Sequence, residues 1–453
     1  MEQMPLFTSN HRQISGAGRD AYGDLANSAM NKLGVEDRAV HGWYRFVLSF
    51  PPHLVDEYIA RFKLDGSSRL LDPFCGTGTT LVQAKKRGIP SVGIEANPVA
   101  SFASRVKIDW RPDPVALKAH ARRIYEKVSE EFKSSRIFDE PLLRLISGDR
   151  SSVLRVLDQE QEKLLLRDSI SALPLHKTLV LLEYIRKENH SDFLRHEMLA
   201  LAKALVNSIS NLRFGPEVGV GTIKEDAPVL RLWQEEVAVM AEDLSHIKDR
   251  APVSSEVHSA DARQLKNLFE PQSIDAVITS PPYPNEKDYT RTTRLELVLL
   301  GFVNSKSELQ ALKKNLIRSN TRSVYKEDDD DQWIASNERI REIADKIEKR
   351  RIELGKTSGF ERLYARVTKL YFGGMFRHLR DMQAVLKPGA HLAYVVGDQA
   401  SYLRVMIRTG EIISDIARSL GYEVIGIDLF RTRLATATRE QLREEIVVLR
   451  WPG

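Results

Sequence analysis

The chain has 453 residues, of which 42% are hydrophobic, and this length predicts two or three folding units with substantial cores. Its 67 Lys and Arg residues against 62 Asp and Glu residues give a net charge of +5, a mild basic excess that permits a polyanionic partner without requiring one. The one cysteine, Cys75, excludes an internal disulfide and favours a reducing compartment. The sequence shows no charged-then-apolar leader and no apolar run of membrane-spanning length, so we expect a cytoplasmic protein without membrane contact.

The chain starts with a polar stretch, residues 1–40, which we expect to form an N-terminal arm. An aromatic-rich segment, residues 41–55, comes next and leads into a helix. Pro51 or Pro52 is expected to start that helix, because proline is favoured in the first turn.

Residues 69–84 predict a strand, a tight glycine loop and a helix. Leu70 and Leu71 are apolar, the sequence DPFCGTG follows them, and an amphipathic segment comes after it. Gly76 and Gly78 let a ligand approach the backbone, and the first helical turn presents unpaired N–H groups at the carboxyl end of the strand. An α/β sheet builds a nucleotide pocket in this way. Because there is only one Gly-x-Gly, a nicotinamide or flavin cofactor is not the best interpretation.

Acidic residues follow the next two predicted strands. Residues 91–94 form a short strand that ends in Glu95, which lies 17 residues after Gly78 and is placed to accept hydrogen bonds from the two hydroxyls of a ribose. The third strand, residues 256–258, is followed by Asp261. Asp261 is either a ligand-binding carboxylate or a helix N-cap, and the two roles are compatible.

A large helical block separates the second and third strands. Apolar residues recur at three- and four-residue steps in residues 116–132, 152–166, 176–185, 193–212 and 229–247. The last two of these predicted helices are joined by a glycine-rich loop, residues 213–222, which bears Arg213 and Phe214. This loop either reaches a DNA backbone or a flipped base, or merely connects two helices.

A fourth strand, residues 273–278, ends in the sequence TSPPY at residues 279–283. Two consecutive prolines fix the backbone in an extended turn, so the neighbouring carbonyls have no local N–H partner and can face outward as acceptors. The ring of Tyr283 offers a flat surface beside these acceptors. Downstream, residues 378–386 predict a helix, residues 391–398 a strand, and residues 423–427 and 445–449 a terminal strand pair whose last member is antiparallel.

The motifs together resemble those of the S-adenosylmethionine-dependent methyltransferases. DPFCGTG at residues 72–78 and GIEANP at residues 93–98 resemble motifs one and two, most of all in the branch that methylates exocyclic amino groups of nucleobases. TSPPY resembles motif four, and serine at its second position is the form most often linked with cytosine N4 rather than adenine N6. Residues 41–109 and 256–300 carry motifs that resemble ten, one, two, three and four in this order.

The resemblance implies an α/β fold, a Rossmann-like class I methyltransferase sheet with helices on both faces, plus a large helical insertion. It implies a discontinuous catalytic domain at residues 41–110 and 256–453, and an insertion at residues 111–255. The insertion is a candidate for target recognition, and residues 284–355 are a candidate for DNA contacts. The helical block lies between motifs two and three rather than after motif three or four, so the segment that recognises the target stays open.

The resemblance also assigns roles to single residues. The segment before motif one lines the methionine end of the cofactor, and the motif-three carboxylate meets the amino group of its adenine. The implied cofactor-binding residues are Phe50, Pro51, Asp72, Pro73, Phe74, Cys75, Gly76, Thr77, Gly78, Thr79, Thr80, Glu95, Ala96, Asn97, Asp261 and Ala262. The implied catalytic residues are Ser280, Pro281, Pro282 and Tyr283.

The catalytic stretch suits methyl transfer to an aromatic amine. Such an amine is a poor nucleophile because its lone pair is delocalised, and it must be held in line with the sulfonium methyl group. The Ser280 hydroxyl and the Pro281 main chain would hold its two hydrogens, while Tyr283 stacks on a base pulled out of the helix. No metal is expected. Methylation at cytosine C5 needs a cysteine nucleophile, and the one cysteine lies in the cofactor loop, so that reaction is excluded.

Arginines supply the candidate DNA contacts outside the motifs. Arg291 and Arg294 are placed for phosphates, or else they pair with Glu286, Asp288 or Glu296. We expect Arg431, Arg433 and Arg439 to bind phosphates from an exposed connection before the last strand. The acidic run at residues 327–331 lacks the spacing of a calcium loop and is expected to be solvated.

These observations favour a DNA methyltransferase that modifies cytosine N4 in a flipped base, with S-adenosylmethionine as cofactor and DNA as partner. Adenine N6 methylation by the same mechanism, a structured-RNA amino methyltransferase and a catalytically idle DNA-binding subunit are the alternatives. A cognate restriction or defence protein is a further candidate partner, and the oligomeric state stays open.

Overall fold

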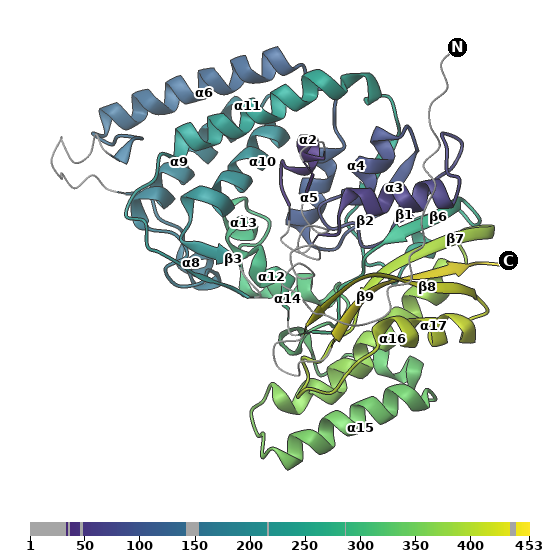
Figure 1. Cartoon of the computed structure of the whole chain (residues 1–453). Coiled ribbons are helices and arrows are strands. Elements are labelled where there is room, and N and C mark those ends of the chain that lie inside the picture. Colours follow the sequence, from purple (N-terminus) through teal and green to yellow (C-terminus); the bar gives the residue numbers. More distant parts are fainter. Residues whose placement is uncertain are drawn as a thin grey trace, which may run out of the picture.

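The computed structural model describes residues 33–34, 37–45, 49–141, 154–214, 217–285, 287–434 and 441–453, so most of the expected N-terminal arm lies outside the described residues. A sheet of seven strands in the order β5-β2-β1-β6-β7-β9-β8 forms its centre (Figure 1). Neighbouring strands from β5 to β7 are parallel, and β9 runs antiparallel to β7 and β8. The strands are β1 (Leu70–Asp72), β2 (Ser91–Ile94), β5 (Ser255–His258), β6 (Ile274–Thr279), β7 (Leu386–Gly397), β8 (Glu423–Leu434) and β9 (Gln441–Arg450).

Alternating apolar residues give the sheet two buried faces. Leu70 and Ala276 pack on one face with helix α3 (Pro52–Arg61). Leu71 and Val277 pack on the other face with helices α16 (Tyr364–Met382) and α17 (Thr409–Ser419). Successive side chains of a strand point to opposite sides, so a run such as residues 392–396 serves both cores. The predicted Rossmann-like methyltransferase sheet with helices on both faces is confirmed.

Two short helices follow the first two strands. Each begins directly after the loop that leaves its strand. Helix α4 (Thr79–Lys86) starts directly behind the glycine loop, and helix α5 (Pro98–Lys107) starts behind Glu95. The Asn97 side chain caps α5 by accepting hydrogen bonds from the Val99 and Ala100 N–H groups at 3.1 and 3.4 Å. The cap fixes where α5 begins, and therefore where Glu95 lies.

The helical insertion gathers to one side of the sheet, on α5 (Figure 1). Its core is formed by buried faces of the longer helices and includes the fully buried Trp233. Among the described residues, no helix has both the length and the apolar character that crossing a membrane requires. The insertion helices are α6 (Pro114–Ser134), α8 (Gln159–Leu164), α9 (Ala172–Glu188), α10 (Leu194–Ala204) and α11 (Val229–Ile247).

The helix expected at residues 193–212 is shorter than predicted. Helix α10 ends at Ala204, a π-helical turn covers Leu205–Ile209, and a hairpin of β3 (Leu212–Phe214) and β4 (Val218–Val220) follows in the glycine-rich segment. Asn211 explains the change of direction. Its side chain donates to the Asp168 carbonyl at 3.0 Å and accepts from the Lys224 N–H at 2.8 Å, which ties the chain back to the start of α9.

The C-terminal half adds further helices, some of which join the core of the insertion. These are α12 (Tyr289–Thr292), α13 (Arg294–Leu299), α14 (Lys306–Lys314) and α15 (Glu338–Glu353), and α15 packs its apolar side on α16. The predicted helix at residues 378–386 ends earlier, at Met382, and Leu386 already belongs to β7. The reason is sheet pairing, since the Val385 carbonyl accepts from the Ile274 N–H at 3.0 Å.

The expectation that the acidic run at residues 327–331 is solvated was wrong for Asp330, whereas Glu327 and Asp329 are exposed as expected. Asp330 is 3% exposed and accepts hydrogen bonds from the guanidinium groups of Arg263 and Arg377. Gly373 in α16 allows this burial, because a Cβ atom there would lie 1.9 Å from the Asp330 carbonyl oxygen. Asp330 is therefore part of the packing against α16.

Replacement of Arg263 by methionine tests this buried network. Arg263 bridges Asp261 and Asp330, so its loss leaves two buried carboxylates with less compensation and should lower the unfolding free energy by about 3–5 kcal/mol. Arg418→Met, which breaks an exposed pair with Asp415, should cost less than about 1 kcal/mol. Urea unfolding measures both, and equal losses would contradict the role of the network.

Candidate active site

A cavity of about 800 Å³ opens at the carboxyl ends of the parallel strands. Its volume lies in the range of about 300–1,000 Å³ that is usual for small-ligand sites. Loops after β1, β2, β5 and β6 meet in it, so all four motif regions contribute. The predicted residues that line it are Phe50, Pro73, Phe74, Cys75, Gly76, Thr77, Thr79, Glu95, Ala96, Asn97, Asp261, Ala262, Ser280, Pro281, Pro282, Tyr283 and Arg431.

The glycine loop after β1 is held from behind by α5. Gly78 has φ +84° and a Cβ atom there would lie 2.9 Å from Ser104 Oγ, so this position requires glycine. Ser104 Oγ donates to the Gly76 carbonyl at 2.7 Å, and Lys107 Nζ donates to the Thr77 carbonyl at 2.7 Å. Burial, with nearby cations, lowers the pKa of Lys107 to about 7. The loop is thus fixed by α5 before any ligand binds.

Four residues that were predicted to bind cofactor do not line the cavity. They are Pro51, Asp72, Gly78 and Thr80. Pro51 is the N-cap residue of α3, Gly78 forms the turn, and Thr80 Oγ1 donates to the Ile278 carbonyl at 3.2 Å. These residues support the residues that line the cavity but do not line it themselves.

Asp72 lies beneath the loop and joins two strands. Its Oδ1 atom accepts hydrogen bonds from Thr279 Oγ1 at 2.6 Å and from the Phe74 N–H at 3.1 Å. Burial raises the pKa of Asp72 to about 6, and these hydrogen bonds oppose the shift. Because Asp72 ends β1 and Thr279 ends β6, the contact fixes the glycine loop against the TSPPY segment.

Glu95 stands at the cavity wall at the tip of β2. Its two carboxylate oxygens accept from the Gly76 N–H at 2.9 Å and the Asn97 N–H at 2.7 Å. Each oxygen keeps a further lone pair for a ligand. Burial raises the pKa of Glu95 to about 7, so this carboxylate changes charge near neutral pH.

Asp261 also lines the cavity, but its carboxylate is already paired. Arg263 Nε and Nη2 donate to Asp261 at distances of 2.6–3.0 Å, and the Arg263 N–H donates to Oδ1 at 2.9 Å. This pairing was not predicted from the sequence. Asp261 is therefore held rigidly at the edge of the cavity.

The TSPPY segment faces the glycine loop across the cavity. Ser280 Oγ donates to the Val395 carbonyl at 3.2 Å, so its hydroxyl hydrogen is engaged and its lone pairs stay available as acceptors. The Tyr283 ring lies against Gly397, where a Cβ atom would approach Tyr283 Cε2 to 2.9 Å. Both catalytic candidates are therefore positioned by β7.

The predicted DNA-contacting arginines fall into different places. Arg294 donates to the carbonyls of Thr290 and Leu164 at 3.1 and 3.2 Å, so its guanidinium holds the insertion rather than facing outward. Arg291 does not line the cavity, and neither do Arg213 and Phe214, which belong to strand β3.

The exposed connection before the last strand was predicted to start at an earlier residue than it does. Arg431 and Arg433 belong to β8, because the strand continues to Leu434. Arg431 lines the cavity and pairs with Glu444. The side chain of Arg433 and the whole of Arg439 lie outside the described residues.

Several lining residues were not predicted individually: some fall within residues 284–355, the candidate segment for DNA contacts, and others come from distant segments. Tyr289 had a weak signal as an aromatic residue after TSPPY, and burial raises its pKa to about 12. The polar stretch from Asn315 to Ser323 carried no motif. The missed residues with polar or aromatic side chains are Ser49, Glu217, Asn285, Lys287, Tyr289, Asn315, Ser319, Asn320, Ser323, Gln399, Ser401, Phe430 and Glu444.

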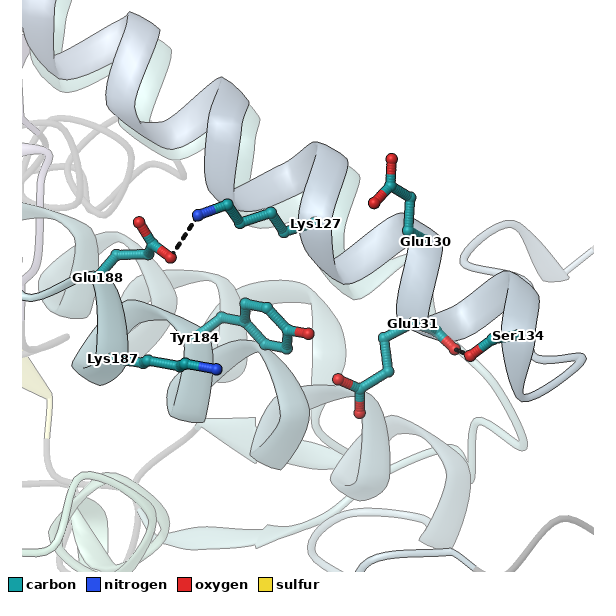
Figure 2. A pocket seen from close by; sticks show the side chains of 7 residues that line it. All are labelled: Lys127, Glu130, Glu131, Ser134, Tyr184, Lys187 and Glu188. Atoms are coloured by element: carbon teal, nitrogen blue, oxygen red, sulfur yellow. Dashed lines mark hydrogen bonds and ion pairs between the residues drawn. The ribbon is translucent and has the colours of Figure 1, made fainter.

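A second depression, of about 570 Å³, lies on the insertion between α6 and α9 (Figure 2). Charged side chains line it, and Lys127 Nζ pairs with Glu188 across it at 2.6 Å. It is open to solvent and contains no motif residue, so it is not a candidate for the active site. Among the described residues, no group of three His, Cys, Asp or Glu side chains is arranged to hold a metal ion.

Comparison with known proteins agrees with this geometry. The chain is 26% identical over 442 residues to the Type II methyltransferase M.BsoBI of Geobacillus stearothermophilus, covering 92% of this chain and 85% of that protein. It is 25% identical over 449 residues to the Type II methyltransferase M.AvaI of Nostoc sp., covering 90% and 86%. The chain has a methyltransferase fold. No family model matches the sequence.

A local match extends the methyltransferase relationship to an archaeal protein. Over 82 residues the chain is 39% identical to the Type II methyltransferase M.MjaII of Methanocaldococcus jannaschii, which covers 18% of this chain and 15% of that protein. The two bacterial matches span nearly the whole chain and therefore include the helical insertion.

Proposed function

We propose that the protein is an S-adenosylmethionine-dependent DNA methyltransferase that modifies the exocyclic N4 amino group of cytosine in a flipped-out base. The observation that carries the proposal is one cavity lined by both the DPFCGTG loop and the SPPY segment. The names of the relatives, all Type II methyltransferases, support methyl transfer to DNA.

The cavity fits the cofactor on its own geometry. Gly76 lines it, and a Cβ atom at Gly76 would meet no protein atom within 4 Å, so a side chain there would occupy the cavity itself. Glu95 offers acceptor lone pairs for ribose hydroxyls, and Asp261 is fixed where the adenine amino group is expected. When bound, S-adenosylmethionine supplies a methyl group that its sulfonium charge already activates.

The SPPY residues would position the target amine. The Ser280 hydroxyl donates its hydrogen to the Val395 carbonyl. The Ser280 oxygen would therefore accept a hydrogen bond from one hydrogen of the target amine. The Pro281 carbonyl accepts from the other, and Tyr283 stacks on the base. Fixing both hydrogens directs the nitrogen lone pair, which is the positioning that this reaction needs.

The state of Cys75 supports an amine rather than a carbon as the methyl acceptor. Its side chain is buried against Gly93, where a Cβ atom would lie 2.7 Å from the sulfur. Burial, with Asp72 and Glu95 nearby, raises the pKa of the Cys75 thiol well above its usual range. A buried neutral thiol is a poor nucleophile, so C5 methylation of cytosine does not fit.

Target recognition is proposed to be shared between the insertion and residues 284–355. Glu217, on the insertion hairpin, and Asn320, on the second segment, both line the cavity. Arg322 lies 3.8 Å from Glu217 and connects the two segments. A base that enters the cavity would therefore pass both the insertion hairpin and residues 284–355.

Cofactor binding should depend on pH through Glu95. Ribose hydroxyls donate hydrogen bonds, so the ionised carboxylate binds better than the protonated one. With the Glu95 pKa at about 7, affinity for S-adenosylmethionine should rise from about pH 6 to about pH 8, by up to about tenfold per pH unit below 7. Calorimetry measures this, and Glu95→Gln should bind more weakly and lose that dependence. Identical pH profiles for both proteins would remove Glu95 from the ribose role.

Nucleoside mass spectrometry tests the proposed reaction. Unmethylated DNA incubated with the protein and S-adenosylmethionine should yield N4-methylcytosine. Ser280→Ala should lower the rate about a hundredfold through misplacement of the amine, and Tyr283→Ala should lose stacking worth roughly 1–3 kcal/mol. Ser419→Ala, on α17, is the matched control and should keep full activity.

The same assay separates the alternatives. N6-methyladenine in place of N4-methylcytosine would keep the mechanism and change the base. Product on RNA alone would indicate a structured-RNA methyltransferase, and no product on either nucleic acid would indicate an idle subunit.

A further inference from the structure

Strand β8 contains an irregularity at the cavity. Leu429 is opposite Glu445 on β9, but Arg431 is opposite Glu444, so Phe430 and Arg431 together face one residue of β9. This is a β-bulge, which bends a strand and re-aims its side chains, often next to active sites. Both Phe430 and Arg431 line the cavity as a result.

Arg431 is held in one orientation by Glu444. Its Nε atom donates to Glu444 Oε2 at 2.6 Å, and the two side chains are 17% and 13% exposed. In the part of the chain that the structure describes, the two terminal nitrogens of Arg431 have no hydrogen-bond partner. A fixed guanidinium with both terminal nitrogens available can make two parallel hydrogen bonds to a ligand.

A series of contacts connects Arg431 to the catalytic residues. A Cβ atom at Gly397 would lie 2.9 Å from Tyr283 Cε2 and 3.5 Å from Glu444 Cγ, so both side chains pack on the same glycine. Two residues earlier on β7, the Val395 carbonyl accepts from Ser280. Arg431 therefore faces the part of the cavity where Tyr283 would stack a base.

The chemistry of the base edge decides what this guanidinium would bind. Cytosine presents two adjacent acceptors, N3 and O2, beside its N4 amino group, whereas adenine presents only N1 beside N6, followed by a C–H group. A planar fork of two N–H donors matches the cytosine edge, and with adenine one donor stays unpaired, which is costly in a closed site.

We propose that Arg431, oriented by Glu444, is a base-specificity residue that donates hydrogen bonds to N3 and O2 of the flipped cytosine. This inference rests on the proposed function and deepens it. It replaces the expectation of a phosphate contact at Arg431.

Two substitutions at Arg431 test the inference. Once the modified cytosine has been located, duplexes that carry cytosine or adenine at that position are compared in single-turnover methylation. Arg431→Met should slow cytosine methylation about tenfold to hundredfold, with a much smaller change for adenine. Arg431→Lys keeps the charge but not the fork, so it should narrow the preference for cytosine in the same way. Arg450→Lys, at the far end of β9 in a pair with Glu423, is the matched control.

Different results would overturn the inference. A phosphate contact predicts that Arg431→Lys keeps the rate and the base preference, and that Arg431→Met slows both bases equally. A merely structural role predicts that both variants lose affinity for S-adenosylmethionine in calorimetry, and we expect that affinity to be unchanged. Wild-type protein that produces no N4-methylcytosine would reject the proposed function itself, so the two failures are distinguishable.

Discussion

The buried hydrogen bond between Asp72 and Thr279 is the contact on which the site depends. It joins the last residue of β1 to the last residue of β6, two neighbouring parallel strands. The glycine loop and the SPPY segment leave the sheet directly after these residues. One buried contact thus sets the separation between the loop expected to hold the cofactor and the segment expected to hold the base.

The sheet topology supplies the rest of the site. Parallel strands bring the loops after β1, β2, β5 and β6 to one edge. The antiparallel strand β9 starts at the same edge, where Glu444 is opposite Gly397. Through this reversal the β8–β9 pair contributes Phe430, Arg431 and Glu444 to the cavity.

The sequence predicted those features that short segments determine. DPFCGTG, Glu95 and TSPPY each follow an apolar strand, so their positions at strand ends could be derived from local patterns, and the order of the motifs predicted the fold. The helical block was also visible, because apolar periodicity extends over long helices such as α6 and α11.

Features that depend on distant contacts could not be predicted in this way. Asp72 was assigned to the ligand, although its partner is Thr279, more than 200 positions later. Asp330 was predicted to be solvated, because the local sequence does not show that Arg263 and Arg377 pair with it in the fold. The β8 bulge that re-aims Arg431 is a matter of strand register, and no local pattern in residues 423–434 reports register.

The central claim is that one cavity brings cofactor and target base together. A crystal structure with bound S-adenosylhomocysteine tests it most directly. The account predicts the ribose at Glu95, the adenine beside Asp261 and the sulfur facing Ser280 and Tyr283. The analogue bound outside this cavity, or with its sulfur turned away from the SPPY segment, would contradict the account.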